Sequence, residues 1–162
     1  TSALNNILER TKKSLVHILL ENTSGSGSWL GYKFEHQRRI IDGIEQKHRV
    51  GICWDTCHSY TAGYDLAHRE GYEETIRQID EIVGLKRLKL IHLNDSKDKL
   101  GSHRDRHEHI GKGKIGFEAF RRILHDERLK DAAFILETPK DTEDSDRINL
   151  ETVRKLRRVR KG

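Results

Sequence analysis

Four short apolar runs, each with an acidic or histidine side chain at or just beyond its end, most constrain the fold of this 162-residue chain. They cover residues 15–20, 50–54, 88–93 and 132–136. Nearly continuous apolar runs of this length are typical of strands that are buried on both faces in a parallel sheet. The sequence therefore predicts four such strands.

Stretches with a helical spacing of apolar residues lie around and between these runs. The predicted helices cover residues 5–13, 34–45, 72–83, 117–125 and 147–160. Residues 55–71 and 92–116 lack this spacing and are predicted to be loops. Strands that alternate with helices imply a parallel sheet with its helices outside.

Four strand–helix units make half of an α/β (β/α)8 TIM barrel, whose full length is typically about 250 residues. An open doubly wound sheet would also fit this chain length. We favour the barrel, because a polar side chain follows every strand. We expect residues 1–162 to form a single, partial domain. The chain begins with Thr1 and contains no Met, which we interpret as a fragment or a processed product.

The chain is basic, with 31 Lys and Arg against 26 Asp and Glu and a net charge of +5. This charge suits a polyanionic partner, although a solubilising surface explains it equally well. The only cysteines, Cys53 and Cys57, do not form a disulfide framework, so we expect a reduced, cytoplasmic setting. No apolar run approaches the roughly 18–20 residues of a membrane span, so we expect no membrane partner.

The side chains at the four strand ends are a candidate metal site: Glu21, Asp55, His92 and Glu137. In a barrel the carboxyl ends of all strands open on one face, where these four side chains would converge. Carboxylates together with a histidine suit Zn²⁺, Mn²⁺ or Mg²⁺, and the histidine favours the first two.

A second candidate cluster comprises His58, Asp105 and His107. His58 lies three residues after Asp55, at the mouth of the same strand. Asp105 and His107 are two residues apart, so they point the same way in an extended segment. Two histidines and a carboxylate form a three-ligand zinc site with an open position, which is the catalytic pattern.

Four segments carry a family resemblance: ENTSGSGSWLG, DTCHSYTAGYDL, HLNDSKDKLGSHRDRHEHIGKGKIG and ILET. They resemble endonuclease IV, the metal-dependent apurinic/apyrimidinic endonucleases of base excision DNA repair. The likeness runs from about residue 15 to residue 138. It implies the carboxyl-terminal half of a TIM barrel that is a monomer when intact. It also implies hydrolysis of double-stranded DNA on the 5′ side of abasic sites.

The resemblance also implies residue roles and three zinc ions per intact enzyme, with Mn²⁺ possible at one site. Glu21 would bridge two of the metals, and one of these would also bind Asp55, His92 and Glu137. His58, Asp105 and His107 would bind the third metal. Glu21 and Glu137 would be the catalytic residues, Glu137 by orienting or deprotonating the attacking water.

Candidate DNA contacts lie on the same face. Gly25 and Gly27 let their loop approach a DNA backbone, and Trp29 either supports a splayed nucleotide or packs the loop. Four basic side chains are candidate phosphate contacts: Lys97, Lys99, Arg104 and Arg106. We interpret the basic end of the chain, including Arg160 and Lys161, as a solvated surface.

The resemblance covers only part of a family member, because the two histidines that the first metal takes from earlier strands are missing. We therefore expect this chain alone to be inactive. Two alternatives stay open. One is a sugar isomerase or epimerase of the xylose isomerase type, which needs a single metal and has no use for the second cluster. The other is a non-catalytic half barrel whose exposed sheet edges pair with another chain.

Overall fold

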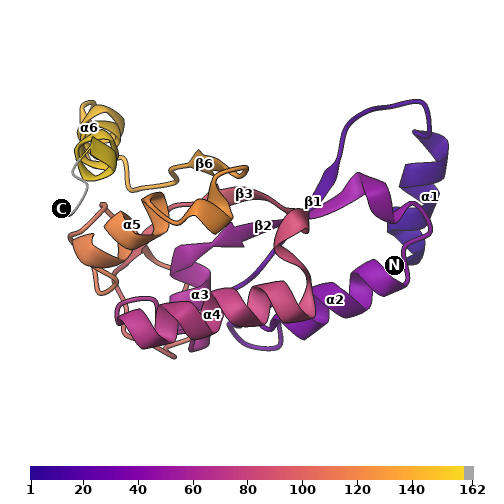
Figure 1. Ribbon diagram of the computed structural model, residues 1–162, viewed down its shortest axis with the longest axis horizontal. Coiled ribbons are helices and arrows are strands. Elements are labelled where there is room, and N and C mark those ends of the chain that lie inside the picture. The colour runs from indigo at the N-terminus through magenta and orange to yellow at the C-terminus, as the bar shows by residue number, and fades with distance from the viewer. Residues whose placement is uncertain (159–162) are drawn as a thin grey trace.

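The computed structural model describes residues 1–158 and contains a four-stranded parallel sheet (Figure 1). Its strands, in the order in which they lie side by side, are β1 (Ile18–Glu21), β2 (Val50–Asp55), β3 (Leu88–His92) and β6 (Ala133–Ile135). All three neighbouring pairs are parallel, so the four carboxyl ends lie along one edge of the sheet. The predicted parallel sheet is therefore confirmed.

Helices connect the strands. They are α1 (Ser2–Arg10), α2 (Phe34–Asp42), α3 (Thr56–Ala62), α4 (Arg69–Ile82), α5 (Phe117–Leu124) and α6 (Ser145–Arg158), with short 3-10 turns η1 (Lys47–Arg49), η2 (Leu85–Arg87) and η3 (Glu127–Leu129). In Figure 1, α2 and α4 lie along one side of the sheet, whereas α1 and α6 lie at opposite ends of the molecule. The predicted outer helices are thus present.

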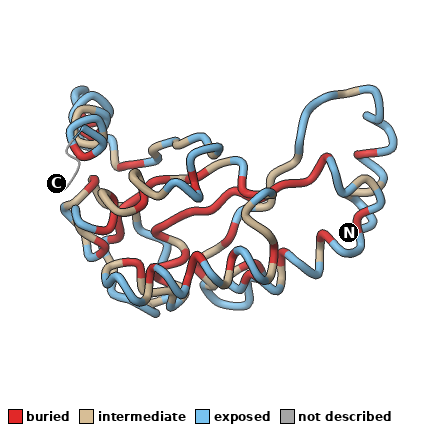
Figure 2. The backbone as a smooth tube through the Cα atoms, viewed as in Figure 1, coloured by how far each residue is buried: buried red, intermediate tan, exposed pale blue. Residues whose placement is uncertain are grey.

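The core lies between the sheet and these helices. Every residue of β2 is buried, and Trp54, Ile91 and Tyr72 are among the largest fully enclosed side chains. Figure 2 shows this burial concentrated along the central strands. The edge strand β6 is exposed at two of its three residues, so the sheet is covered unevenly.

Two sequence-based expectations about local structure were wrong. Residues 56–62 were predicted to be a loop but form α3, because Asp55 caps the helix through the backbone N–H of His58 and Gly63 ends it in the left-handed region. The first strand was expected from residue 15 but starts at Ile18. Leu15 and Val16 are 96% and 69% exposed, and the pairing with β2 begins only at Ile18.

Other boundaries differ from the predictions by a few residues. The predicted helix 34–45 ends at Asp42, and the predicted helix 147–160 begins at Ser145. Arg160 and Lys161, from the predicted basic end, lie outside the described residues. The predicted loop 92–116 contains one small antiparallel pair, β4 (Asp95–Ser96) with β5 (His107–Glu108).

Replacing Ile91 tests the core. Because this side chain is fully buried, Ile91→Ala should lower the free energy of unfolding by about 2–5 kcal/mol. The control Ile148→Ala removes an isoleucine that is 45% exposed and should cost less than about 1 kcal/mol. Urea denaturation followed by circular dichroism measures both. Equal losses in the two variants would contradict the assigned core.

Candidate metal centre

The carboxyl ends of the four strands bring four acidic and histidine side chains together. One donor atom from each of Glu21, Asp55, His92 and Glu137 lies within 4.8 Å of the others. His92 is central to them, with its Nδ1 3.1 Å from Glu21 Oε1 and 3.1 Å from Glu137 Oε2. These are the four residues that the strand ends suggested, and the fold places them at one point.

A second group, from α3, β5 and the loop between β4 and β5, lies against the first. Donor atoms of His58, Asp105 and His107 also lie within 4.8 Å of one another. Asp105 Oδ1 is 3.1 Å from His58 Nε2 and 3.4 Å from His107 Nε2. The groups meet where His58 Nδ1 approaches Glu21 Oε1 at 3.4 Å. Seven donors therefore form one continuous patch with two centres.

The two histidines of the second group have oriented rings. His58 Nδ1 lies 2.8 Å from the backbone oxygen of Asn22, and His107 Nδ1 lies 2.9 Å from that of Glu137. A carbonyl accepts a hydrogen bond, so each Nδ1 atom donates to its carbonyl, and each Nε2 atom is left on the opposite side of its ring. Carbonyl partners of this kind are the usual outer support of metal-binding histidines.

Those two Nε2 atoms are buried and have no hydrogen-bond partner within residues 1–158. Their contacts with Asp105 have ion-pair distances but not hydrogen-bond geometry. Either a proton on each Nε2 or a shared metal ion would balance the charge of the Asp105 carboxylate that faces them. The donor set thus fits a divalent metal ion, with imidazole and carboxylate as its ligands.

The close contacts among these groups shift their pKa values. Hydrogen bonds from His58 and His92 lower the pKa of Glu21 to about 2. Burial opposes charge on His58, but its contacts with Asp105 and Glu21 raise its pKa to about 11. The Cys53 thiol and Glu21 raise the pKa of His92 to about 10. Without metal, protons on the imidazoles balance the carboxylates. A bound cation displaces such protons, so binding releases them.

Both cysteines are free and buried beside the centre. Cys53 lies near Glu21 and His92, and Cys57 lies near Asp55 and His107. Burial raises the pKa of Cys57 to about 12, so its thiol stays protonated and is a poor metal ligand. The carboxylates and imidazoles are the better donors.

Two buried asparagines, which the sequence reasoning missed, hold the first group in place. Asn94 donates from Nδ2 to Asp55 Oδ2 at 2.7 Å and accepts the backbone N–H of Glu137 at 2.8 Å. Asn22 accepts the backbone N–H of Asp55 at 2.7 Å. The sequence did contain a signal for both asparagines. Asn22 directly follows Glu21, and Asn94 lies two residues after His92.

A buried carboxylate organises the loop that carries Asp105 and His107. Asp95 accepts backbone N–H groups from Ser96, Gly111, Gly113 and Ile115 at 2.8–3.0 Å. A Cβ on Gly113 would lie 2.5 Å from Asp95 Oδ1, so only glycine fits there. These hydrogen bonds fix the segment that follows β5, and β5 in turn positions His107.

The candidate DNA contacts lie on loops at the same edge of the sheet. Trp29 is 70% exposed, and Lys97, Lys99 and Arg104 are also exposed. Arg106 forms a two-pronged ion pair with Asp98 at 2.6 and 2.7 Å, which offsets its charge. Both glycines of this set have positive φ, +77° at Gly25 and +58° at Gly27.

Two histidines without a role in the sequence reasoning turn out to join loops. His103 approaches the backbone oxygen of Ser24 at 2.9 Å and accepts a hydrogen bond from Ser26, so it ties the glycine-serine loop to the metal loop. A Cβ on Gly25 would lie 2.9 Å from the His103 ring. His109 contacts Asn149 of α6 at 2.9 Å.

Among residues 1–158, no helix is both long and apolar enough to cross a membrane.

The chain is similar to known proteins in both sequence and structure. A family model described as a xylose isomerase-like TIM barrel matches residues 1–159. A probable endonuclease 4 from Chloroflexus aurantiacus is 51% identical over 140 residues, which cover 86% of this chain and 49% of that protein. One from Trichlorobacter lovleyi is 47% identical over 156 residues, which cover 96% of this chain and 56% of the relative.

A solved structure is also similar. The crystal structure of endonuclease IV from Thermus thermophilus aligns with a TM-score of 0.75 and 42% identity, over 85% of this chain and 48% of that one. The chain spans about half the length of the curated relatives it matches. Its open sheet is therefore about half of a TIM barrel, as the sequence predicted, and the doubly wound alternative is rejected.

The variant Asn94→Ala tests whether this asparagine positions the candidate metal ligands, because it removes none of them. Asp55 and the Glu137 backbone both lose a partner, so affinity for a divalent cation should fall about 10–100-fold. Competition with a chromogenic chelator measures this affinity. The control is Asn6→Ala, an exposed position on α1, and it should bind as tightly as the parent. An unchanged affinity in Asn94→Ala would show that the asparagine does not position ligands.

Proposed function

The chain belongs to the endonuclease IV family of xylose isomerase-like TIM barrels, and from this premise we propose that it is the metal-binding half of a zinc-dependent DNA-repair endonuclease. The reaction is hydrolysis of the phosphodiester bond on the 5′ side of an abasic site in double-stranded DNA. Residues 1–162 are a partial domain of an intracellular enzyme that is monomeric when intact. The observation that carries the proposal is the joining of two donor clusters through Glu21 and His58.

The proposed ligands divide along the two clusters. Glu21 would contribute a ligand to two metal ions, and Asp55, His92 and Glu137 would hold one of them. His58, Asp105 and His107 would hold another. Imidazole with carboxylate suits Zn²⁺, and Mn²⁺ is an acceptable substitute at one position. When bound, these ions supply positive charge to the phosphate and make a nearby water more acidic.

The protein's own groups then act on that water and on the phosphate. Glu137 has its backbone N–H fixed by Asn94 and its backbone oxygen fixed by His107, while its carboxylate remains half-exposed at the mouth of the site. These contacts support a role for Glu137 in orienting the attacking water and accepting its proton. Glu21 stays ionised because His58 and His92 lower its pKa, so it keeps its charge throughout.

DNA reaches this face through the exposed loops. Lys97, Lys99 and Arg104 present charge for backbone phosphates, and the loop that contains Gly25 and Gly27 would approach the DNA backbone beside Trp29. Arg106 belongs to the same set, although its ion pair with Asp98 makes its contribution smaller. The rest of the family's barrel completes both the metal site and the DNA surface, so we expect no cleavage by these 162 residues alone.

A single-metal sugar isomerase is the second candidate, because the matching family model is of the xylose isomerase type. The strand-end cluster of Glu21, Asp55, His92 and Glu137 would satisfy such an enzyme. It would leave His58 and His107 with buried, unpartnered Nε2 atoms and no purpose. The nuclease uses both clusters and is the better account.

His107→Ala tests this choice in the full-length protein. Loss of an imidazole from the second cluster should lower cleavage of an oligonucleotide duplex with one abasic site by about a hundredfold or more. Zinc content should fall in parallel. The control His48→Ala changes an exposed histidine near η1 and should leave both values unchanged. Interconversion of an aldose and a ketose without abasic-site cleavage would favour the isomerase.

Lys99→Ala tests the DNA surface. Binding to abasic duplex should weaken, and the slope of log affinity against log salt should become shallower by about one, because one phosphate contact releases fewer counterions. Lys86→Ala is the control, since this exposed lysine lies in η2 at the amino end of β3, away from the site. Fluorescence anisotropy over a salt series measures both. Identical slopes in the two variants would exclude Lys99 from the interface.

A further inference from the structure

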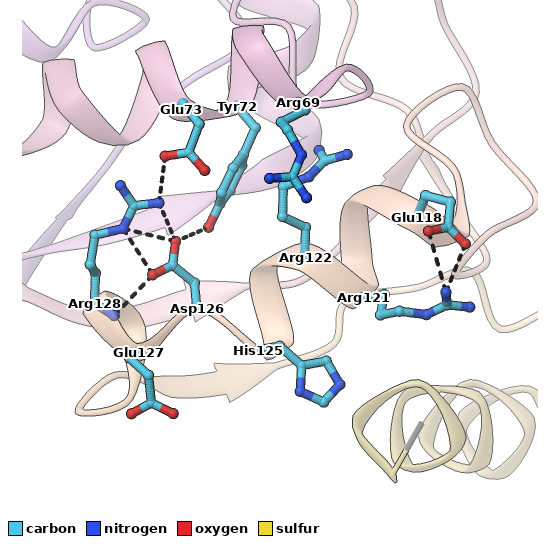
Figure 3. A pocket seen from close by; sticks show the side chains of 10 residues that line it. All are labelled: Arg69, Tyr72, Glu73, Glu118, Arg121, Arg122, His125, Asp126, Glu127 and Arg128. Carbon is cyan, nitrogen blue, oxygen red and sulfur yellow. Dashed lines mark hydrogen bonds and ion pairs between the residues drawn. The ribbon is translucent and has the colours of Figure 1, made fainter. Parts of the chain in front are cut away.

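A cavity of about 740 Å³ lies in the helical layer, apart from the metal centre. Figure 3 shows its walls, which come from α4, α5 and the turn η3. None of the seven metal-site residues lines it. Both walls belong to the described part of this chain, so the cavity does not require the remainder of the barrel. Four arginines line it: Arg69, Arg121, Arg122 and Arg128.

Two of these arginines are neutralised by carboxylates. Arg128 donates to Glu73 at 2.8 Å and to Asp126 at 2.6 Å, and Asp126 also accepts the Tyr72 hydroxyl at 2.6 Å. Arg121 pairs with Glu118 at 3.0 Å. These contacts make one part of the cavity wall acidic and internally satisfied.

The other two, Arg69 and Arg122, form no ion pair with a carboxylate within residues 1–158. Arg122 lies over the Tyr72 ring, with its guanidinium carbon 5.4 Å from the ring centre, and donates only to the Leu66 carbonyl. Arg69 stands one helical turn before Tyr72 on α4, and Figure 3 shows both arginines reaching into the space beside Tyr72. Most of their N–H donors are therefore uncommitted.

A third donor in the same wall is also unused. The Nε atom of Arg121 is buried and has no hydrogen-bond partner among the described residues. A buried donor without an acceptor costs free energy, and like-charged guanidinium groups repel one another. An oxyanion relieves both costs, because guanidinium groups match phosphate oxygens in charge and geometry.

We propose that this cavity binds a nucleoside phosphate, with its phosphate held by Arg69 and Arg122. Its volume suits a small molecule of this size. Glu73, which also binds Arg128, and Glu127 line the cavity as well, and their carboxylates accept hydrogen bonds from ribose hydroxyls or base amino groups. The same carboxylates repel a continuous polyanion, so a DNA backbone is the poorer occupant. This inference does not rest on the nuclease proposal.

Isothermal titration with ADP tests the proposal in purified full-length protein. EDTA is present, so that metal ions at the other site do not contribute to phosphate binding. ADP should bind, and adenosine, which lacks the phosphates, should not. Arg69→Gln/Arg122→Gln should weaken ADP binding by about tenfold or more. The single variant Arg69→Gln, at an exposed position, should show part of this loss if the double variant is unstable.

The matched control is Arg77→Gln. This arginine lies on the same helix but pairs with Glu74 and Glu81 outside the cavity, and its loss should leave ADP affinity unchanged. No heat with ADP at millimolar concentration overturns the proposal, as does an equal loss in Arg77→Gln. Displacement of ADP by an undamaged DNA duplex also overturns it, because the cavity would then be a DNA contact.

Discussion

The rest of the site depends on one buried carboxylate, that of Asp55, being held in a fixed position. Its side chain is fully enclosed, and burial raises its pKa, so its charge is stable only with specific partners. Asn94 donates to one oxygen and the backbone N–H of His58 to the other. The second contact also starts α3, so a single side chain joins the end of β2, the next helix and the metal cluster.

This arrangement explains why the second cluster stands where it does. Because Asp55 caps α3, His58 falls in the first turn of that helix and faces Glu21 and Asp105. His107 approaches the other Asp55 oxygen, Oδ2, at 3.7 Å. A change in the cap would thus disturb Asp55 of the first cluster and His58 of the second together.

The sequence predicted well the strands and the acidic and histidine side chains that meet at their ends, because apolar runs and strand ends are local signals. It failed at α3, where Thr56, Ser59 and Thr61 are buried and hydrogen-bonded inside the protein. A helix enclosed on several sides has no polar face, so its apolar spacing disappears. The roles of Asn94 and Asp95 were likewise hidden, since both depend on contacts with residues far away in sequence.

The groups that position the candidate ligands and the edges of the sheet differ in how completely this chain encloses them. Asn22, Asn94 and Asp95, which orient the ligands, all lie within this chain and are buried. By contrast, the apolar side chains of Leu15 and Ile135, beside the outer strands β1 and β6, are exposed. Side chains that could hold a cation, and the buried groups that position them, thus lie together within this half barrel, whereas the two edges of its sheet are left open.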